Sequence, residues 1–92
     1  MDPGRIAERL DALDGWALTP DGSAITRRFR FKGFAKAVEM ANLAAWLGNK
    51  RNHHPDIAFG WGYCQVSFTT HEAGGLTEAD FDCAAHLDAL LS

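Results

Sequence analysis

Cysteine, proline and long apolar runs are all scarce in this 92-residue sequence. Its two cysteines, Cys64 and Cys83, each fall within an apolar pattern and lack the C-x-x-C spacing of a zinc site. Two cysteines are too few for a disulfide scaffold, so we expect reduced core residues and a reducing compartment. No run approaches about 18 apolar residues, and the N-terminus has no apolar signal segment. The sequence therefore predicts a cytoplasmic protein that does not contact a membrane.

Excess positive charge is missing too, because the formal net charge is −3. The 47% hydrophobic and 23% charged content is typical of a globular protein rather than a disordered one. One basic cluster, Arg27, Arg28, Arg30 and Lys32, lies in a strand-like stretch, and we interpret it as a solvated face. We therefore do not expect a nucleic-acid partner.

At this length the chain predicts a single domain, residues 1–92. Asp2 followed by Pro3 indicates a helix start, and the apolar spacing continues to a stop at Gly15. Residues 15–19 and 24–31 flank a Pro-Asp-Gly turn and predict a β-hairpin. Arg27 has the wrong parity for a dry core, which favours an edge strand or a subunit contact.

Residues 34–47 predict a second helix, ended by Gly48, with a polar stripe of only Lys36, Glu39 and Asn42. Such a broadly apolar helix needs cover on two sides, and a second subunit is the expected cover in so small a protein. A second hairpin, roughly 57–59 and 64–70, and a helix that begins at Thr77 complete the order α-β-β-α-β-β-α. The predicted fold is an α+β two-layer sandwich, a four-stranded antiparallel sheet with helices on one face.

Two adjacent histidines, His53 and His54, precede the second hairpin, and His71 follows it. Because a hairpin brings its two ends together, all three imidazoles can line one cleft. Without further information, ordinary surface histidines are the favoured interpretation, and a metal site is less favoured because no H-x-H or H-x-x-x-H pair is present. Acid–base catalysis suits the residue type, since imidazole exchanges protons near neutral pH.

The stretches "NHHPDI", "TTHEAGGLTEAD" and "FRFKGFAKAVEM" resemble the pterin-4a-carbinolamine dehydratase family. The resemblance rests on the frame that runs from His53-His54-Pro55 through Trp61 and His71 to Asp80. It implies a dehydratase of 4a-hydroxytetrahydrobiopterin that forms quinonoid dihydropterin without a metal or organic cofactor. It also implies a small α+β sandwich that assembles as a homodimer or homotetramer.

By the same resemblance, His53, His54 and His71 are the catalytic residues, with the acid and base roles left open. Pro55 and the segment Thr70, Glu72 and Ala73 are implied to hold the pterin, and Trp16 or Trp61 to stack on its ring. Each tryptophan is more often a core residue, so both interpretations stay open.

Asp80 belongs to the family frame, yet its place three residues after Thr77 already explains it as a helix-start carboxylate, the interpretation we favour. Asn49 stands where the family often has a charged residue, and without a carboxylate there we expect slower turnover, since a negative neighbour stabilises imidazolium. His86 is expected to be a surface or interface residue. Two alternatives remain: a binding module like the animal members that serve as transcription-factor cofactors, or dehydration of a different pterin.

Overall fold

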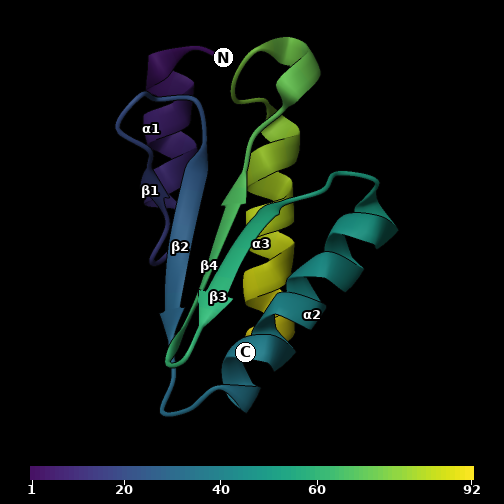
Figure 1. Ribbon diagram of the computed structural model, residues 1–92. Coiled ribbons are helices and arrows are strands. Elements are labelled where there is room, and N and C mark those ends of the chain that lie inside the picture. Colours follow the sequence, from purple (N-terminus) through teal and green to yellow (C-terminus); the bar gives the residue numbers. More distant parts are fainter.

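The computed structural model describes residues 1–92 as three helices and a four-stranded sheet, with one short 3-10 turn, η1 (Figure 1). Each predicted element is present, in the predicted order. The bounds are α1 Pro3–Asp11, β1 Ala17–Leu18, β2 Ile25–Arg30, α2 Ala35–Arg51, β3 Asp56–Gly60, β4 Tyr63–Phe68, η1 His71–Ala73 and α3 Glu78–Leu91.

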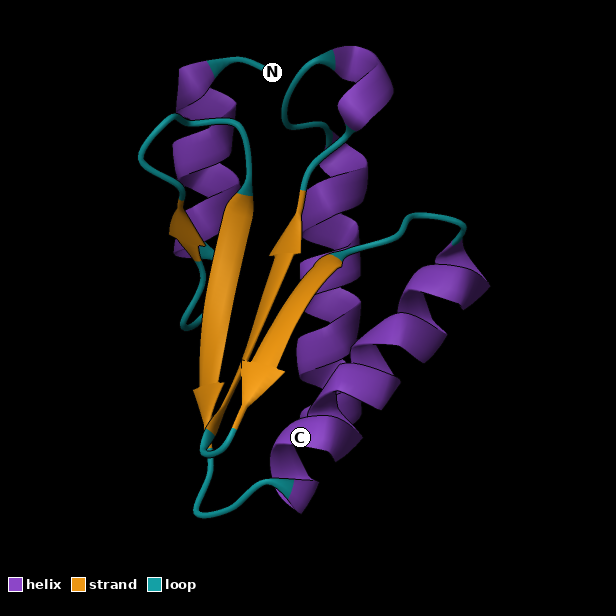
Figure 2. Ribbon diagram, viewed as in Figure 1, coloured by secondary structure: helices purple, strands orange, loops and turns teal.

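The sheet is antiparallel, with the strand order β1-β2-β4-β3. Strands β2 and β4 therefore join the two hairpins at the centre, with Ile25 opposite Phe68 and Arg30 opposite Tyr63. Burial alternates strictly along β4, because one face of the sheet meets the helices while the other stays uncovered. The predicted α+β sandwich with helices on one face is thus confirmed (Figure 2).

A single apolar core lies between the sheet and the helices. Full burial of a large apolar side chain contributes about 1.5–3 kcal/mol, so this cluster supplies the main stabilising term. Its fifteen residues come from both hairpins, α2, α3 and two connecting segments: Trp16, Ile25, Phe29, Met40, Ala41, Ala44, Leu47, Cys64, Val66, Phe68, Leu76, Phe81, Cys83, Ala84 and Leu87.

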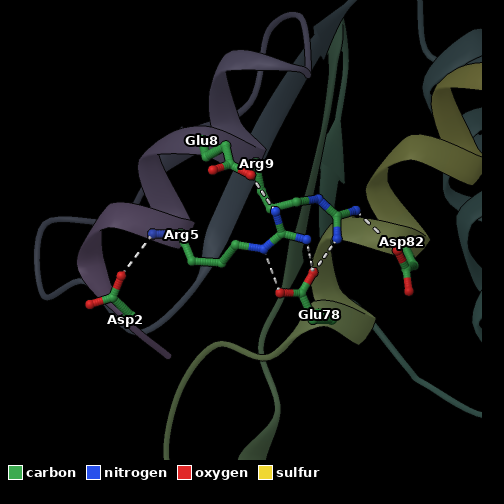
Figure 3. A network of polar contacts seen from close by, with 6 residues as sticks. All are labelled: Asp2, Arg5, Glu8, Arg9, Glu78 and Asp82. Carbon is green, nitrogen blue, oxygen red and sulfur yellow. Dashed lines mark hydrogen bonds and ion pairs between the residues drawn. The ribbon is translucent and has the colours of Figure 1, made fainter.

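Helix α1 has no buried residue and is attached to the start of α3 by charged side chains (Figure 3). Arg5 Nε donates to Glu78 Oε2 at 2.9 Å, and Arg9 Nη2 donates to Asp82 Oδ1 at 3.0 Å. Arg9 also pairs with Glu78, so one carboxylate accepts from both arginines. Exposed ion pairs are individually weak, but a shared network with apolar contacts from Ile6 and Leu10 holds the helix in place.

The predicted helix end at Gly48 is wrong, because α2 continues to Arg51 and ends at Asn52, whose φ of 51° is left-handed. Gly48 serves a close approach instead: a Cβ at this position would lie 2.5 Å from Pro55 Cδ. The sequence pattern could not separate a stop glycine from one that makes room for the returning chain.

Arg27 also has a different explanation from the one expected. β2 lies inside the sheet, although β1 pairs only with Ile25 and Thr26 and leaves the rest of that edge open. The Arg27 guanidinium donates to Asp88 Oδ1 at 2.9 Å and lies 4.5 Å from the centre of the Phe29 ring. An ion pair within the chain therefore satisfies this side chain on the helix face.

No helix has the length and apolar character needed to cross a bilayer. Large apolar side chains are nevertheless exposed on α2 and β3 and in the loop before α2. Trp46 is 52% exposed, and Phe34 and Phe59 lie with their ring centres 6.1 Å apart. Large apolar side chains are therefore open to solvent at both ends of α2.

Candidate active site

The segment that carries the adjacent histidines is fixed by the end of α2. The backbone N–H of His53 donates to Gly48 O at 3.0 Å, which satisfies one of the last helical carbonyls. Asn52 takes the left-handed conformation that reverses the chain, and Pro55 then packs against Gly48. Strand β3 begins at Asp56, so His53 and His54 occupy the short link between helix and sheet.

A pocket of about 150 Å³ gathers the three histidines at this end of the sheet. His71 follows β4, and it reaches the same pocket because antiparallel pairing places the end of β4 beside the start of β3. All lining residues are polar: Asn52, His53, His54, Thr69, His71 and Glu72. The fold thus brings together the residues that the sequence had placed in one cleft.

His53 is the least exposed of the three, and its ring is held on two sides. Its Nε2 lies 2.5 Å from Asp80 Oδ1, and its ring stacks on Phe68 at a centroid distance of 6.2 Å. Asp80 is fully buried, and its Oδ2 accepts hydrogen bonds from Thr70 Oγ1 and from the backbone N–H of Thr77, each at 2.9 Å. A carboxylate only accepts, so His53 Nε2 carries the shared proton and Nδ1 is left to exchange protons with a ligand.

Asp80 therefore has a structural role at the helix start and also a place in the site, the two interpretations that the sequence left open. With Thr77 it completes a capping box at the start of α3, and with its other oxygen it orients His53. The residue favoured as structural also contacts a candidate catalytic group.

His54 is exposed and is the boundary between two hollows. Its Nε2 lies 3.3 Å from Asn49 Oδ1, so His54 is the histidine that a charged residue at position 49 would contact. The second hollow, of about 390 Å³, is lined by Ala45, Trp46, Asn49, His54, Pro55 and Ile57. Pro55 therefore borders this apolar groove instead of the polar pocket.

His71, Glu72 and Ala73 form the 3-10 turn η1, and all three are exposed. Gly74 ends the turn at a φ of 71°, and the backbone of Thr70 pairs with that of Gly75 to close the loop. Glu72 is the only carboxylate that lines the pocket. The Thr70 side chain points elsewhere, because its hydroxyl is buried against Asp80 and Thr77.

The two tryptophans lie outside the pocket. Trp16 is a core residue, with its ring 5.8 Å from Phe68 and its Nε1 bonded to Asp88. Trp61 is 73% exposed in the β3–β4 turn, at the opposite end of that hairpin from the histidines. The expectation that either one stacks on a ligand in this pocket is therefore wrong for this chain. Strand β3 separates Pro55 from Trp61, so the spacing between them in the sequence places Trp61 at the turn, away from the histidines.

No group of three or more histidine, cysteine or acidic side chains is arranged to share one metal ion. The two cysteines are buried and free, and burial raises the pKa of both thiols. His86, on α3, is exposed and takes no part in the pocket.

Comparisons with known proteins agree with the resemblance. The family profile described as pterin 4 alpha carbinolamine dehydratase matches residues 1–90. The chain belongs to this family. A Paracoccus denitrificans protein named "Putative pterin-4-alpha-carbinolamine dehydratase" is 52% identical over 95% of this chain and 85% of its own length. A Stenotrophomonas maltophilia protein of the same name is 42% identical over 98% of this chain and 78% of its own length.

Two solved structures share the fold. One, titled transcriptional coactivator/pterin dehydratase from Brucella melitensis, has a TM-score of 0.90 and 34% identity, covering 100% of this chain and 98% of its own. The other, a pterin dehydratase-like protein identified as a RuBisCO assembly factor in the alpha-carboxysome, has a TM-score of 0.67 and 26% identity, with 83% of this chain and 88% of its own covered. The family fold therefore carries more than one described role.

Sequence reasoning missed three parts of the site. Asn52 and Thr69 line the pocket, and Phe68 forms the floor under the His53 ring. The alternation along β4 does place Phe68 on the core face. Nothing in the sequence indicates that the His53 ring packs against it.

Proposed function

We propose that this protein dehydrates 4a-hydroxytetrahydrobiopterin in tetrahydrobiopterin recycling. In this reaction the C4a–O bond breaks, the N5–H bond breaks, the C4a=N5 double bond forms, and water and quinonoid dihydropterin leave. One group must protonate the departing hydroxyl and another must accept the N5 proton. The supporting observation is a single polar pocket with three imidazoles on its walls, one of them held by a buried carboxylate.

His53, His54 and His71 supply and accept these protons. His53 has Nδ1 left for a ligand, because Nε2 is bonded to Asp80, while the exposed His54 and His71 line the same pocket. General acid–base help of this kind contributes about 10²–10⁴-fold each. No metal or organic cofactor is needed for the elimination. Glu72 lines the pocket, Thr70 and Ala73 stand beside lining residues in the chain, and Pro55 borders the adjoining apolar groove.

We further propose a cytoplasmic homodimer or homotetramer that binds neither nucleic acid nor membranes. The exposed apolar surface of Phe34, Trp46 and Phe59 supports self-association, since burying it removes apolar area from water. The net charge of −3 supports the absence of a nucleic-acid partner, and within the basic cluster Arg27 is paired with Asp88. Sedimentation equilibrium would show the assembly, and a concentration-independent monomer would contradict it.

The activity is tested by generating the carbinolamine with an aromatic amino-acid hydroxylase and following quinonoid dihydropterin formation. We expect the wild-type protein to exceed the uncatalysed rate, and His54→Ala and His71→Ala to lose about 10²-fold or more. His86→Ala is the matched control, because it removes an exposed histidine outside the pocket. A wild-type rate equal to the background would refute the proposal for this substrate.

The same assay with a pterin that lacks the biopterin side chain addresses the other enzymatic alternative. Equal rates for both would show that the pocket recognises the ring alone, and a faster rate for the pterin without the side chain would favour a different pterin as the substrate. The transcriptional and RuBisCO-assembly roles named for the structural neighbours concern those proteins. The retention of all three histidines in one pocket supports the enzymatic role for this chain.

A further inference from the structure

The Thr70 hydroxyl is buried at the end of β4 and reaches no ligand space. Its Oγ1 lies 2.9 Å from Asp80 Oδ2 and 2.8 Å from Thr77 Oγ1, and it is absent from the residues that line the pocket. A buried hydroxyl with two side-chain partners is fixed in both position and direction. This part of the molecule therefore has a role distinct from direct substrate contact.

The hydrogen bonds around Thr70 run in one direction. The Thr77 and Thr70 hydroxyls lie 2.8 Å apart, and Thr77 is the donor in this pair because the single Thr70 hydroxyl proton goes to Asp80. The Thr70 hydroxyl in turn donates to Asp80 Oδ2, which also accepts from the Thr77 backbone N–H. Because a carboxylate oxygen only accepts, the direction of each hydrogen bond in this ring is fixed: Thr77 donates to Thr70, and Thr70 donates to Asp80.

The ring determines which carboxylate oxygen faces the site. Two donors hold Oδ2, so Oδ1 alone is turned toward His53 Nε2, and no side-chain nitrogen or oxygen buried there is left without a partner. Without the Thr70 hydroxyl, Oδ2 keeps only the backbone donor, and the carboxylate gains freedom to rotate about its last torsion.

We propose that Thr70 is a positioning residue: through Asp80 its hydroxyl holds the His53 imidazole with Nε2 as donor and Nδ1 directed at the reacting pterin. This inference rests on the proposed dehydratase function for its kinetic consequence, but the orientation of His53 can be observed without any substrate. The positioning role also explains why Thr70 is buried although His71 and Glu72, which follow it in the chain, are exposed.

The test compares Thr70→Val, which keeps the shape and removes the hydroxyl, with Thr70→Ser, which keeps the hydroxyl. We expect Thr70→Val to lower kcat about tenfold with KM within about twofold, because a charge-assisted hydrogen bond acts on orientation rather than on binding. Thr70→Ser is expected to restore kcat to within about twofold of wild type. Thr70→Ala removes the same hydroxyl without a branched side chain and replaces Thr70→Val if that variant does not fold.

Thr26→Val is the matched control. It removes a hydroxyl that accepts from Ser67 Oγ at 2.8 Å between β2 and β4, and it leaves the whole ring around Asp80 in place. We expect its kcat to stay within about twofold of wild type. Equal losses of kcat in the two variants, or no rescue by Thr70→Ser, would overturn the proposal.

A nitrogen-15 NMR measurement on the free protein separates this proposal from the function itself. We expect a protected downfield Nε2–H proton from His53 in wild type and in Thr70→Ser, and its loss in Thr70→Val. If that pattern is seen in a protein without dehydratase activity, the positioning role stands and the proposed function fails. If the wild type is active and the proton is the same in Thr70→Val, the positioning role alone fails.

Discussion

The replacement of Gly48 by alanine tests how tightly the histidine segment is built against α2. In an ordinary helix interior, alanine is more favourable than glycine by about 1 kcal/mol. Here the added Cβ would lie 2.5 Å from Pro55 Cδ and 3.3 Å from both His53 O and His54 Cα. Carbon atoms pack best at about 3.5–4.0 Å, so the proline ring must move by roughly 1 Å.

Overpacking of this kind costs about 1–3 kcal/mol, and the gain in helix propensity of about 1 kcal/mol offsets part of that cost. At the middle of this range we expect Gly48→Ala to lower the free energy of unfolding by about 1 kcal/mol in urea denaturation. Since His53 and His54 directly precede the displaced proline, we also expect kcat/KM to fall by as much as about 10²-fold, as misplacement by 1 Å can cost.

Gly75→Ala is the matched control, because a Cβ there meets nothing within 4 Å. Its effect on unfolding is expected to be within about 0.5 kcal/mol. A Gly48→Ala protein that is as stable as wild type and turns over carbinolamine at the wild-type rate would refute the steric reasoning.

Three further outcomes are expected. Asp80→Asn should reduce kcat by about 10²-fold or more in the carbinolamine assay, because a neutral amide replaces the carboxylate that holds His53 with one oxygen and accepts from Thr70 and Thr77 with the other; an unchanged kcat would contradict the role of the carboxylate. Burial raises the pKa of Cys64 and Cys83, so the stability that these neutral thiols contribute is present below the ordinary thiol pKa and is lost as pH rises above it. A thiol reagent should react slowly with both cysteines in the native protein, and rapid reaction of both would contradict their burial. Hydrogen bonds from Arg5 and Arg9 lower the pKa of Glu78, so the attachment of α1 should persist at neutral pH and weaken as pH falls below the usual glutamate range. Amide exchange of α1 would show this weakening, and Glu78→Gln should reduce the acid dependence to the part that comes from Asp82.

The fold was predictable because strong local patterns agree with one another. Alternation along β4, the Pro-Asp-Gly turn and the capping box at Thr77 each favour the element that forms there. The gathering of His53, His54 and His71 also followed from sequence, since any hairpin of this length brings its flanking residues together.

The errors share a physical cause, which is that spacing along the chain does not give the direction of a side chain in space. Trp61 lies in the family frame but at the far end of the hairpin, and Trp16 turns into the core to bond Asp88. Gly48 looked like a helix stop, and only the three-dimensional approach of Pro55 explains it. Thr70 shows the same limit, because its hydroxyl turns away from the pocket toward Asp80.

The Asp80 carboxylate both caps the start of α3 and orients His53, so the first turn of this helix and the proposed chemistry depend on the same side chain. Fraying of a terminal turn costs far less free energy than global unfolding and sets in at lower temperature. On heating, turnover would therefore decline while the core, centred on Phe68 and Phe81, is still intact. The protein would lose the proposed activity by local loosening before it melts.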